Sequence, residues 1–198
     1  MKPDLRGTSH SFTGVRFQAA GMIFLLPDSS NPDDFKKRSS GLNVYLVTMI
    51  RKFMVVDDDP DDVDLFLEAL SKIDKTLICD SSKNGRDLLN KLESGTISNP
   101  DIIFLDVNMP DVNGWDCLAN LKADSRFSSI PVIMYSTSSA KRDTEKALKL
   151  GALGFYEKPS SFSLLIDFLQ MIVSIRNLDK NTIELMFQER GTAQKFHV

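Results

Sequence analysis

The sequence predicts an α/β fold in which a five-stranded parallel sheet carries helices on both faces. From residue 52 onward, short apolar runs alternate five times with amphipathic segments. The runs are hydrophobic at successive positions, which is typical of strands covered on both faces. Turn and capping residues such as Asp59-Pro60 and Asn84-Gly85 lie between an apolar run and the amphipathic segment that follows it. This regular alternation favours a doubly wound sandwich.

Each expected strand is followed by its own helix. The strands are expected at 53–56, 77–79, 102–105, 130–135 and 153–156. The helices are expected around 63–70, 88–92, 115–121, 140–150 and 162–175. If the first strand is central, with the third beside it, the sheet order is 2-1-3-4-5, which is the flavodoxin-like arrangement. We expect this domain to extend over residues 52–176.

The segments outside that domain have no sustained hydrophobic period. Residues 1–48 mix Gly, Ser, Pro and Asn with scattered hydrophobic residues, so we expect them to be irregular or disordered. Met49 directly precedes the first strand, and two hypotheses follow: Met49 is the biological start, or residues 1–48 are a flexible arm. Intact-mass analysis of protein from its native source distinguishes them. Residues 177–198 are expected to be a polar tail with a helical turn around 183–187.

Composition argues against two classes of partner. The net charge is −3 and the pI is about 5.4, and no basic stripe with interleaved aromatic residues is present, so nucleic acid is not an expected partner. No apolar run approaches the roughly 20 residues that span a bilayer, so a membrane is not expected either. The two cysteines lie in different predicted elements, and reduced thiols in a cytoplasmic protein are the simplest interpretation.

Aspartates crowd the segment after the first strand, where six of the eight residues from 57 to 64 are Asp. Capping and first-turn positions of a helix explain Asp61, Asp62 and Asp64. They do not explain Asp57 and Asp58, which come directly after the strand. Such bunched charges repel each other unless they share a cation, and oxygen ligands of this kind suit Mg²⁺. At this point a solvated acidic loop and a metal site both remain open.

Three further strands end in polar residues. Asp106 follows the third strand, Ser136-Thr137 ends the fourth, and Lys158 follows the fifth. Ligands of open α/β sheets bind outside the carboxyl ends of the strands. We therefore expect Asp57, Asp58 and Asp106 to converge in one crevice with a hydroxyl and an ammonium group.

Four motifs follow one another through this domain: VVDDDP, FLDVNMPDVNG, PVIMYSTSS and GALGFYEKP. With them, residues 52–175 resemble the receiver domain of bacterial two-component response regulators. The resemblance implies that Asp57 and Asp58 are the acidic pair and that Asp106 is the phosphoacceptor. It also implies a phosphohistidine donor on a sensor histidine kinase or a histidine phosphotransfer protein. The chain's own histidines, His10 and His197, lie in the terminal extensions, so the donor must come from another protein.

The resemblance also assigns the metal and the lysine. Mg²⁺ would be held by Asp57, Asp58, Asp106 and the main-chain carbonyl of Asn108. Lys158 would pair with Asp106 before phosphorylation and with a phosphate oxygen afterwards. The peptide before Pro159 is expected to be cis.

The remaining implied roles concern the switch. Ser136 and Thr137 would bind the phosphate, and Phe155, a position where tyrosine is common, would turn inward. Asn108 and Ser138 would tune dephosphorylation. The protein would then catalyse only its own phosphorylation and dephosphorylation, and would not be a turnover enzyme.

The last helix is expected to carry the output, because no output domain is visible after residue 175. One apolar stripe of this helix suits the sheet. A second stripe is predicted to be an exposed surface for a dimer mate or an unknown downstream target; it consists of Leu164, Phe168, Met171 and Ile175. The alternative is a helix buried on all sides by the tail or the N-terminal extension. The signal would leave the protein either by contact with another protein or by onward phosphotransfer.

Two other functions compete with the phosphorylated switch. A phosphatase of the haloacid-dehalogenase type also uses a strand-end aspartate and Mg²⁺, but it requires an acid where this chain has Asn108. A pseudo-receiver that binds partners without phosphorylation would fit the same fold. The intact set of site residues favours the switch but does not prove its use.

Overall fold

The computed structural model describes residues 16–19, 22–25, 52–137, 140–175 and 196–197. The chain divides into two units, Met1–Met49 and Ile50–Val198. In the first unit, β1 (Arg16–Ala19) pairs with β2 (Met22–Leu25) as an antiparallel hairpin. The sequence did not predict these strands, because residues 1–48 have no sustained hydrophobic period. The helical turn expected around 183–187 lies outside the described residues.

The second unit alternates strands and helices along the chain. Its elements are β3 (Lys52–Val56), α2 (Pro60–Ile73), β4 (Ile78–Ser82), α3 (Gly85–Glu93), β5 (Ile102–Leu105), α4 (Gly114–Ala123), β6 (Val132–Ser136), α5 (Lys141–Lys149), β7 (Gly154–Glu157), α6 (Phe162–Ser174) and β8 (Phe196–His197). The first five of these strands are parallel and lie in the order β4-β3-β5-β6-β7. The predicted 2-1-3-4-5 sheet is therefore confirmed. The sixth strand, β8, was not predicted; it pairs antiparallel with β7 at the edge.

Side-chain caps start four of the helices. Asp59, Asn84 and Asn113 each accept a hydrogen bond from a backbone amide in the first turn of α2, α3 and α4, at 2.9 to 3.0 Å. Such caps satisfy amides that have no partner within the helix. In α6 the cap is Ser161, one residue after the predicted Pro159-Ser160 turn.

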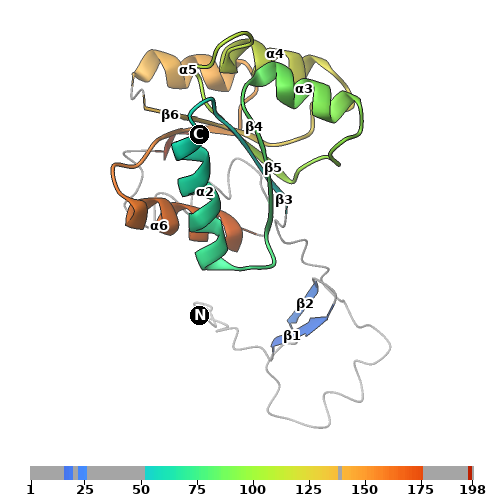
Figure 1. Ribbon diagram of the computed structural model, residues 1–198, viewed down its shortest axis with the longest axis vertical. Coiled ribbons are helices and arrows are strands. Elements are labelled where there is room, and N and C mark those ends of the chain that lie inside the picture. Colours follow the sequence, from blue (N-terminus) through green and yellow to red (C-terminus); the bar gives the residue numbers. More distant parts are fainter. Residues whose placement is uncertain (1–15, 20–21, 26–51, 138–139, 176–195, 198) are drawn as a thin grey trace, which may run out of the picture. The chain divides into compact units, whose positions relative to one another are not determined.

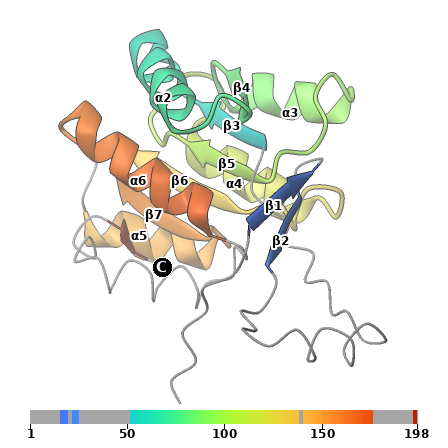
Figure 2. The ribbon, with the colours of Figure 1, turned by 90° about the horizontal axis from the view of Figure 1, so that it is seen from below.

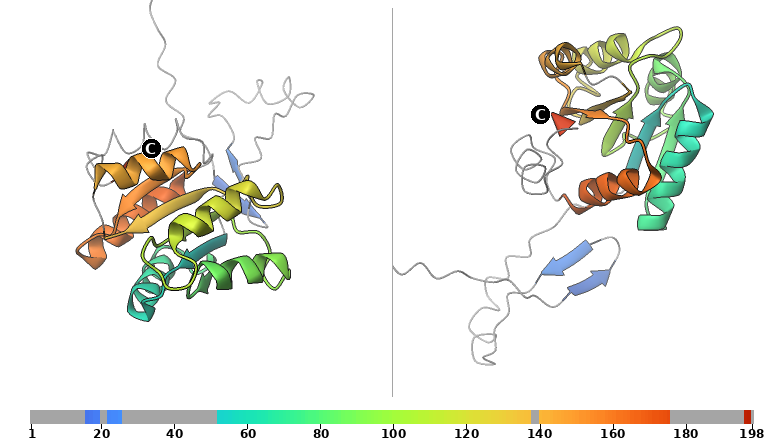
Figure 3. Two further views of the ribbon diagram at one scale, coloured as in Figure 1. Left: turned by 90° about the horizontal axis from the view of Figure 1, so that it is seen from above. Right: turned by 90° about the vertical axis from the view of Figure 1, so that its left-hand side faces the viewer.

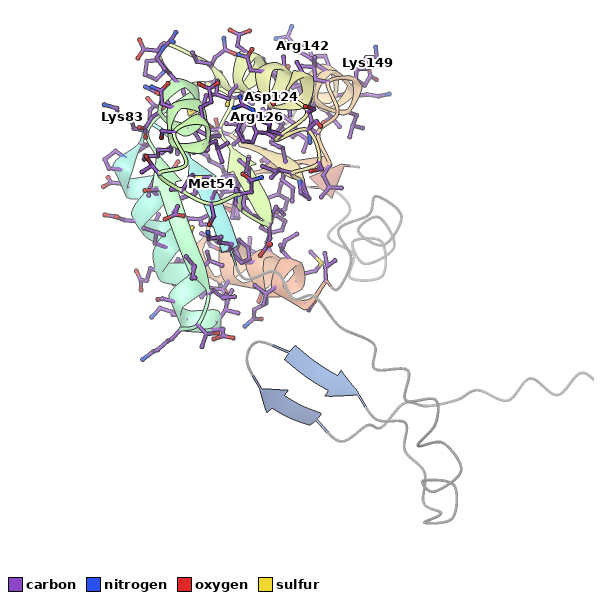
Figure 4. The ribbon with its side chains drawn as sticks, turned by 90° about the vertical axis from the view of Figure 1, so that its right-hand side faces the viewer. Met54, Lys83, Asp124, Arg126, Arg142 and Lys149 are labelled. Carbon is purple, nitrogen blue, oxygen red and sulfur yellow. The ribbon has the colours of Figure 1, made fainter. Side chains whose placement is uncertain are left out.

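The sheet separates two hydrophobic layers. Helices α2 and α6 cover one face, while α3, α4 and α5 cover the other (Figure 1). Figure 2 views the first face and the left panel of Figure 3 the second. Along β3, Phe53 and Val55 point to the α2/α6 layer, and Met54 and Val56 point to the opposite layer. Figure 4 shows Met54 in the interior, as expected for a strand buried on both faces. Arg142 and Lys149 of α5 lie at the periphery.

Aromatic rings fill the layer beneath α2 and α6. Phe104 of β5 contacts Phe66 of α2 at 4.9 Å and Phe168 of α6 at 5.9 Å, measured between ring centroids. Phe168 also stacks on Tyr156 of β7. These contacts join both helices to the sheet.

This packing corrects the predicted partner surface. Phe168 is only 3% exposed, and Met171 and Ile175 are also buried, whereas Leu164 is 42% exposed. The prediction of an exposed stripe is therefore wrong for three of its four residues. The reason is that α6 packs against α2 as well as against the sheet, so two of its sides are covered.

Cys79 is partly buried, Cys117 is fully buried, and both are free. Burial raises the pKa of both thiols to about 12. Because the thiolate is the reactive form, we expect both to react slowly with Ellman's reagent at pH 8 in the folded protein. The same protein in denaturant should react fully and fast. Rapid reaction of one equivalent before unfolding would contradict this prediction.

Among the helices that the structure describes, none combines the length and apolar character that crossing a bilayer requires.

Candidate functional site

Two neighbouring strands bring acidic residues to the same edge of the sheet. In the parallel register, Val56 of β3 lies opposite Leu105 of β5, so Asp57 and Asp106 follow side by side. The Asp106 amide donates to the Val56 carbonyl at 2.9 Å. The register that buries both strands therefore also places the two carboxylates.

The structure brings Asp57, Asp58 and Asp106 together, as predicted. One carboxylate oxygen from each lies within 4.8 Å of the others. Asp57 and Asp106 are buried and Asp58 is exposed, so the group opens to solvent on one side. Buried carboxylates are costly unless a positive charge is close. Three clustered oxygen donors fit Mg²⁺, which takes one or two carboxylates and keeps several waters.

Backbone amides orient the buried carboxylates. The Asn108 amide donates to Asp106 Oδ2 at 2.6 Å, and the Asp59 amide donates to Asp57 Oδ1 at 3.1 Å. The side chain of Asn108 is exposed at this edge. Each carboxylate is therefore fixed on one oxygen while its other oxygen faces Lys158.

Lys158 reaches the site from the segment after β7. Its Nζ lies 2.6 Å from Asp57 Oδ2, 2.7 Å from Asp62 Oδ2 and 3.3 Å from Asp106 Oδ1. Its amide donates to the Ser136 carbonyl at 2.8 Å, which links it to the end of β6. The pair with Asp106 was predicted, but two other carboxylates are closer.

Asp62 is the residue that sequence reasoning missed, because it was explained as a first-turn residue of α2. Helix α2 begins at the carboxyl end of β3, so its first turn lies beside the acidic group. Helical side chains lean toward the N-terminus of their helix, which carries Asp62 back toward that edge. This geometry is the signal that could have identified it.

Charge and burial oppose each other at these groups. Burial raises the pKa of Asp57, while the hydrogen bond and charge of Lys158 pull it down. Burial lowers the pKa of Lys158, but hydrogen bonds to Asp57 and Asp62 and the charge of Asp106 raise it above its usual value. Lys158 is therefore an ammonium ion at neutral pH.

The hydroxyl and aromatic positions lie at neighbouring strand ends. Ser136 ends β6 and is fully buried, and Thr137 is exposed. Phe155 lies opposite Met134 and is buried in the layer of α3, α4 and α5. Phe155 is 1% exposed in this structure, and the inward turn of its ring on phosphorylation stays a prediction. Ser138 lies outside the described residues.

The peptide between Lys158 and Pro159 is trans, so the expected cis bond is wrong. An X–Pro peptide favours trans by about 0.5–1 kcal/mol unless the surroundings select the cis form.

The loop after Asp106 depends on a glycine. The Gly114 amide donates to the Val107 carbonyl at 3.1 Å, which folds the loop back on β5. A Cβ atom at Gly114 would lie 2.1 Å from the Asp106 carbonyl oxygen. The helix α4 and the Asp106 backbone therefore touch at a point where only glycine fits.

Residues 53–170 match the family model of the response regulator receiver domain. The chain belongs to this family. Its receiver domain is 29% identical over 122 residues to chemotaxis protein CheY1 of Helicobacter pylori, covering 62% of this chain and 96% of that protein. A signalling domain of two-component systems with an acidic phosphorylation site is therefore present, rather than a turnover enzyme.

A second relative is much longer. The chain is 31% identical over 141 residues to a protein-glutamate methylesterase/protein-glutamine glutaminase of Methanococcoides burtonii. The match covers 68% of this chain but only 38% of that protein. The similarity is therefore no evidence that this chain has methylesterase activity.

Solved structures resemble the receiver domain as well. The phosphorylated cyanobacterial phytochrome response regulator RcpA superposes with a TM-score of 0.58 at 28% identity, covering 62% of this chain and 90% of that one. The Mn²⁺-bound response regulator Rcp1 gives 0.55 at 26% identity, with 63% and 93% covered. Receiver domains partner with histidine kinases and use a divalent metal, and the acidic group here is able to hold one.

Proposed function

We propose that this receiver domain accepts a phosphoryl group on Asp106 from a phosphohistidine of a sensor histidine kinase or a histidine phosphotransfer protein. One observation carries the proposal. The buried Asp106 carboxylate lies in the acidic group with Asp57 and Asp58 and 3.3 Å from the Lys158 ammonium. A nucleophile, a place for a cation and a fixed positive charge therefore share one crevice.

The chemistry needs one nucleophile and much charge neutralisation. A carboxylate oxygen of Asp106 attacks the phosphorus, so an O–P bond forms while the donor's P–N bond breaks and its imidazole takes up a proton. Asp57, Asp58, Asp106 and the Asn108 carbonyl would hold Mg²⁺, whose charge offsets that of the phosphoryl oxygens. Lys158 supplies the second positive charge, directed at the same oxygens.

The switch in this proposal is local. The Ser136 hydroxyl, with Thr137 beside it, binds the new phosphate, and the inward ring of Phe155 packs behind it. Asn108 and Ser138 set the access of attacking water and hence the lifetime of the phosphorylated state. The signal then passes to another protein by contact or by onward phosphotransfer.

The test is covalent labelling by acetyl phosphate with Mg²⁺, followed by intact-mass analysis. We expect the mass of one phosphoryl group on the wild type and on the surface control Asp167→Asn, and none on Asp106→Asn. Chelation of Mg²⁺ by EDTA should prevent the labelling. Because Asp106 is the nucleophile, the side-chain amide of the Asp106→Asn variant cannot form the acyl phosphate.

Other results would support the competing functions. No phosphate on the wild type would contradict the proposal and favour a pseudo-receiver that acts by binding alone. Sustained hydrolysis of acetyl phosphate over many turnovers would favour a phosphatase.

A further inference from the structure

Lys158 has partners of two different kinds. Asp57 and Asp106 belong to the group of three carboxylates that could hold a metal, whereas Asp62 does not. Asp62 comes from the first turn of α2 and lies 2.7 Å from the Lys158 ammonium, nearly as close as Asp57 at 2.6 Å. Its side chain is 36% exposed and that of Lys158 is 12% exposed. Lys158 thus bridges the group of three carboxylates and Asp62, a separate carboxylate at the rim of that group.

A cation bound by Asp57, Asp58 and Asp106 would change how strongly each carboxylate attracts Lys158. It would share the charges of Asp57 and Asp106, so the attraction of both carboxylates for Lys158 would fall. Two positive charges held by the same carboxylates also repel each other. Of the three carboxylates that pair with Lys158, Asp62 alone keeps its full negative charge in that situation.

We propose that Asp62 is a positioning residue that holds the Lys158 ammonium at the rim when the cation binds. From the rim the ammonium can later reach a phosphate oxygen on Asp106. This inference rests on the proposed function, because it assumes a cation in the acidic group. It assigns to Asp62 a role that helix capping does not require, since Asp59 is already the N-cap of α2.

The proposal predicts the direction of a change in metal affinity. Without Asp62, Lys158 has to stay on Asp57 and Asp106, where it competes with the cation. Asp62→Asn should therefore weaken Mg²⁺ binding, by about twofold to tenfold for a partly exposed charged pair. The matched control is Asp61→Asn, because Asp61 is the adjacent acid of the same turn and is exposed.

A double-mutant cycle separates positioning from simple loss of charge. The dissociation constant of Mg²⁺ is measured by calorimetry, without a phosphoryl donor, in the wild type, Asp62→Asn, Lys158→Met and the double variant. If Asp62 acts through Lys158, its substitution changes Mg²⁺ affinity in the wild type and has no effect in the Lys158→Met background. Equal weakening in both backgrounds would overturn the positioning role. Absence of Mg²⁺ binding by the wild type would overturn the proposed function as well.

A second measurement covers the case in which Lys158→Met does not fold. Acylation of Lys158 by acetic anhydride in Mg²⁺-saturated protein is followed by peptide mass spectrometry. Asp62→Asn should speed this labelling by about twofold to fivefold, because an ion pair of this exposure shields the amine only to that extent. Asp61→Asn should leave the rate unchanged, and Asp62→Glu should restore it. An unchanged rate in Asp62→Asn would overturn the inference.

Discussion

Phe168→Ala is expected to lower the free energy of unfolding by about 3–5 kcal/mol, the usual cost of removing a buried phenylalanine ring. The ring is 3% exposed and contacts both Phe104 of β5 and Tyr156 of β7. Its removal would leave a cavity between α6 and the sheet that rigid aromatic neighbours cannot fill. Urea denaturation followed by circular dichroism measures the change.

The matched control for this variant is Leu164→Ala. Leu164 is an exposed residue of the same helix, so its substitution should change stability by less than about 1 kcal/mol. Equal effects at both positions would show that α6 is not packed as described. The same burial means that Phe168→Glu should unfold the domain rather than interrupt an association.

Gly114→Ala is expected to slow acetyl phosphate labelling of Asp106 by about a hundredfold, the usual cost of misplacing a reacting group by roughly 1 Å. The added Cβ would overlap the Asp106 carbonyl oxygen at 2.1 Å, so the backbone that carries the nucleophile has to move. Overpacking should also cost about 1–3 kcal/mol of stability. The labelling rate by intact mass and the urea midpoint are both measured.

Gly95→Ala serves as the control for this variant. Gly95 has a positive φ of 69° but no atom within 4 Å of an added Cβ. The substitution there should cost about 1–2 kcal/mol through backbone strain alone and leave the labelling rate unchanged. A normal labelling rate in Gly114→Ala would contradict the geometry of the Asp106 loop.

The sheet could be predicted because every one of its five parallel strands has a separate apolar run. Burial of β3, β5, β6 and β7 on both faces leaves a continuous hydrophobic pattern, and the turn residues between the strands are also local signals. The edge strand β4 is more exposed, and only its Ile78 and Cys79 belong to an apolar run. The strand β8 could not be predicted in the same way. It has two residues, and its pairing with β7 depends on a contact some 40 residues away in the chain.

The candidate site was predictable to the same degree and for a similar reason. Asp57, Asp58 and Asp106 follow directly from strand ends, so the register alone brings them together. To predict that Asp62 belongs to the site, one would have to know the direction in which α2 leaves the sheet. The burial of Phe168 required knowledge that α2 and α6 are neighbours, which the pattern of a single helix does not contain.

The pairing of β8 with β7 has a practical consequence. Because Phe196–His197 adds a strand beside Phe155 and Tyr156, a purification tag or fluorescent protein inserted directly after β8 would begin next to the strand that leads to Lys158. Such a fusion adds bulk to the edge of the sheet that carries the proposed switch. Kinetic and binding assays of this protein are therefore best performed without a fusion next to β8.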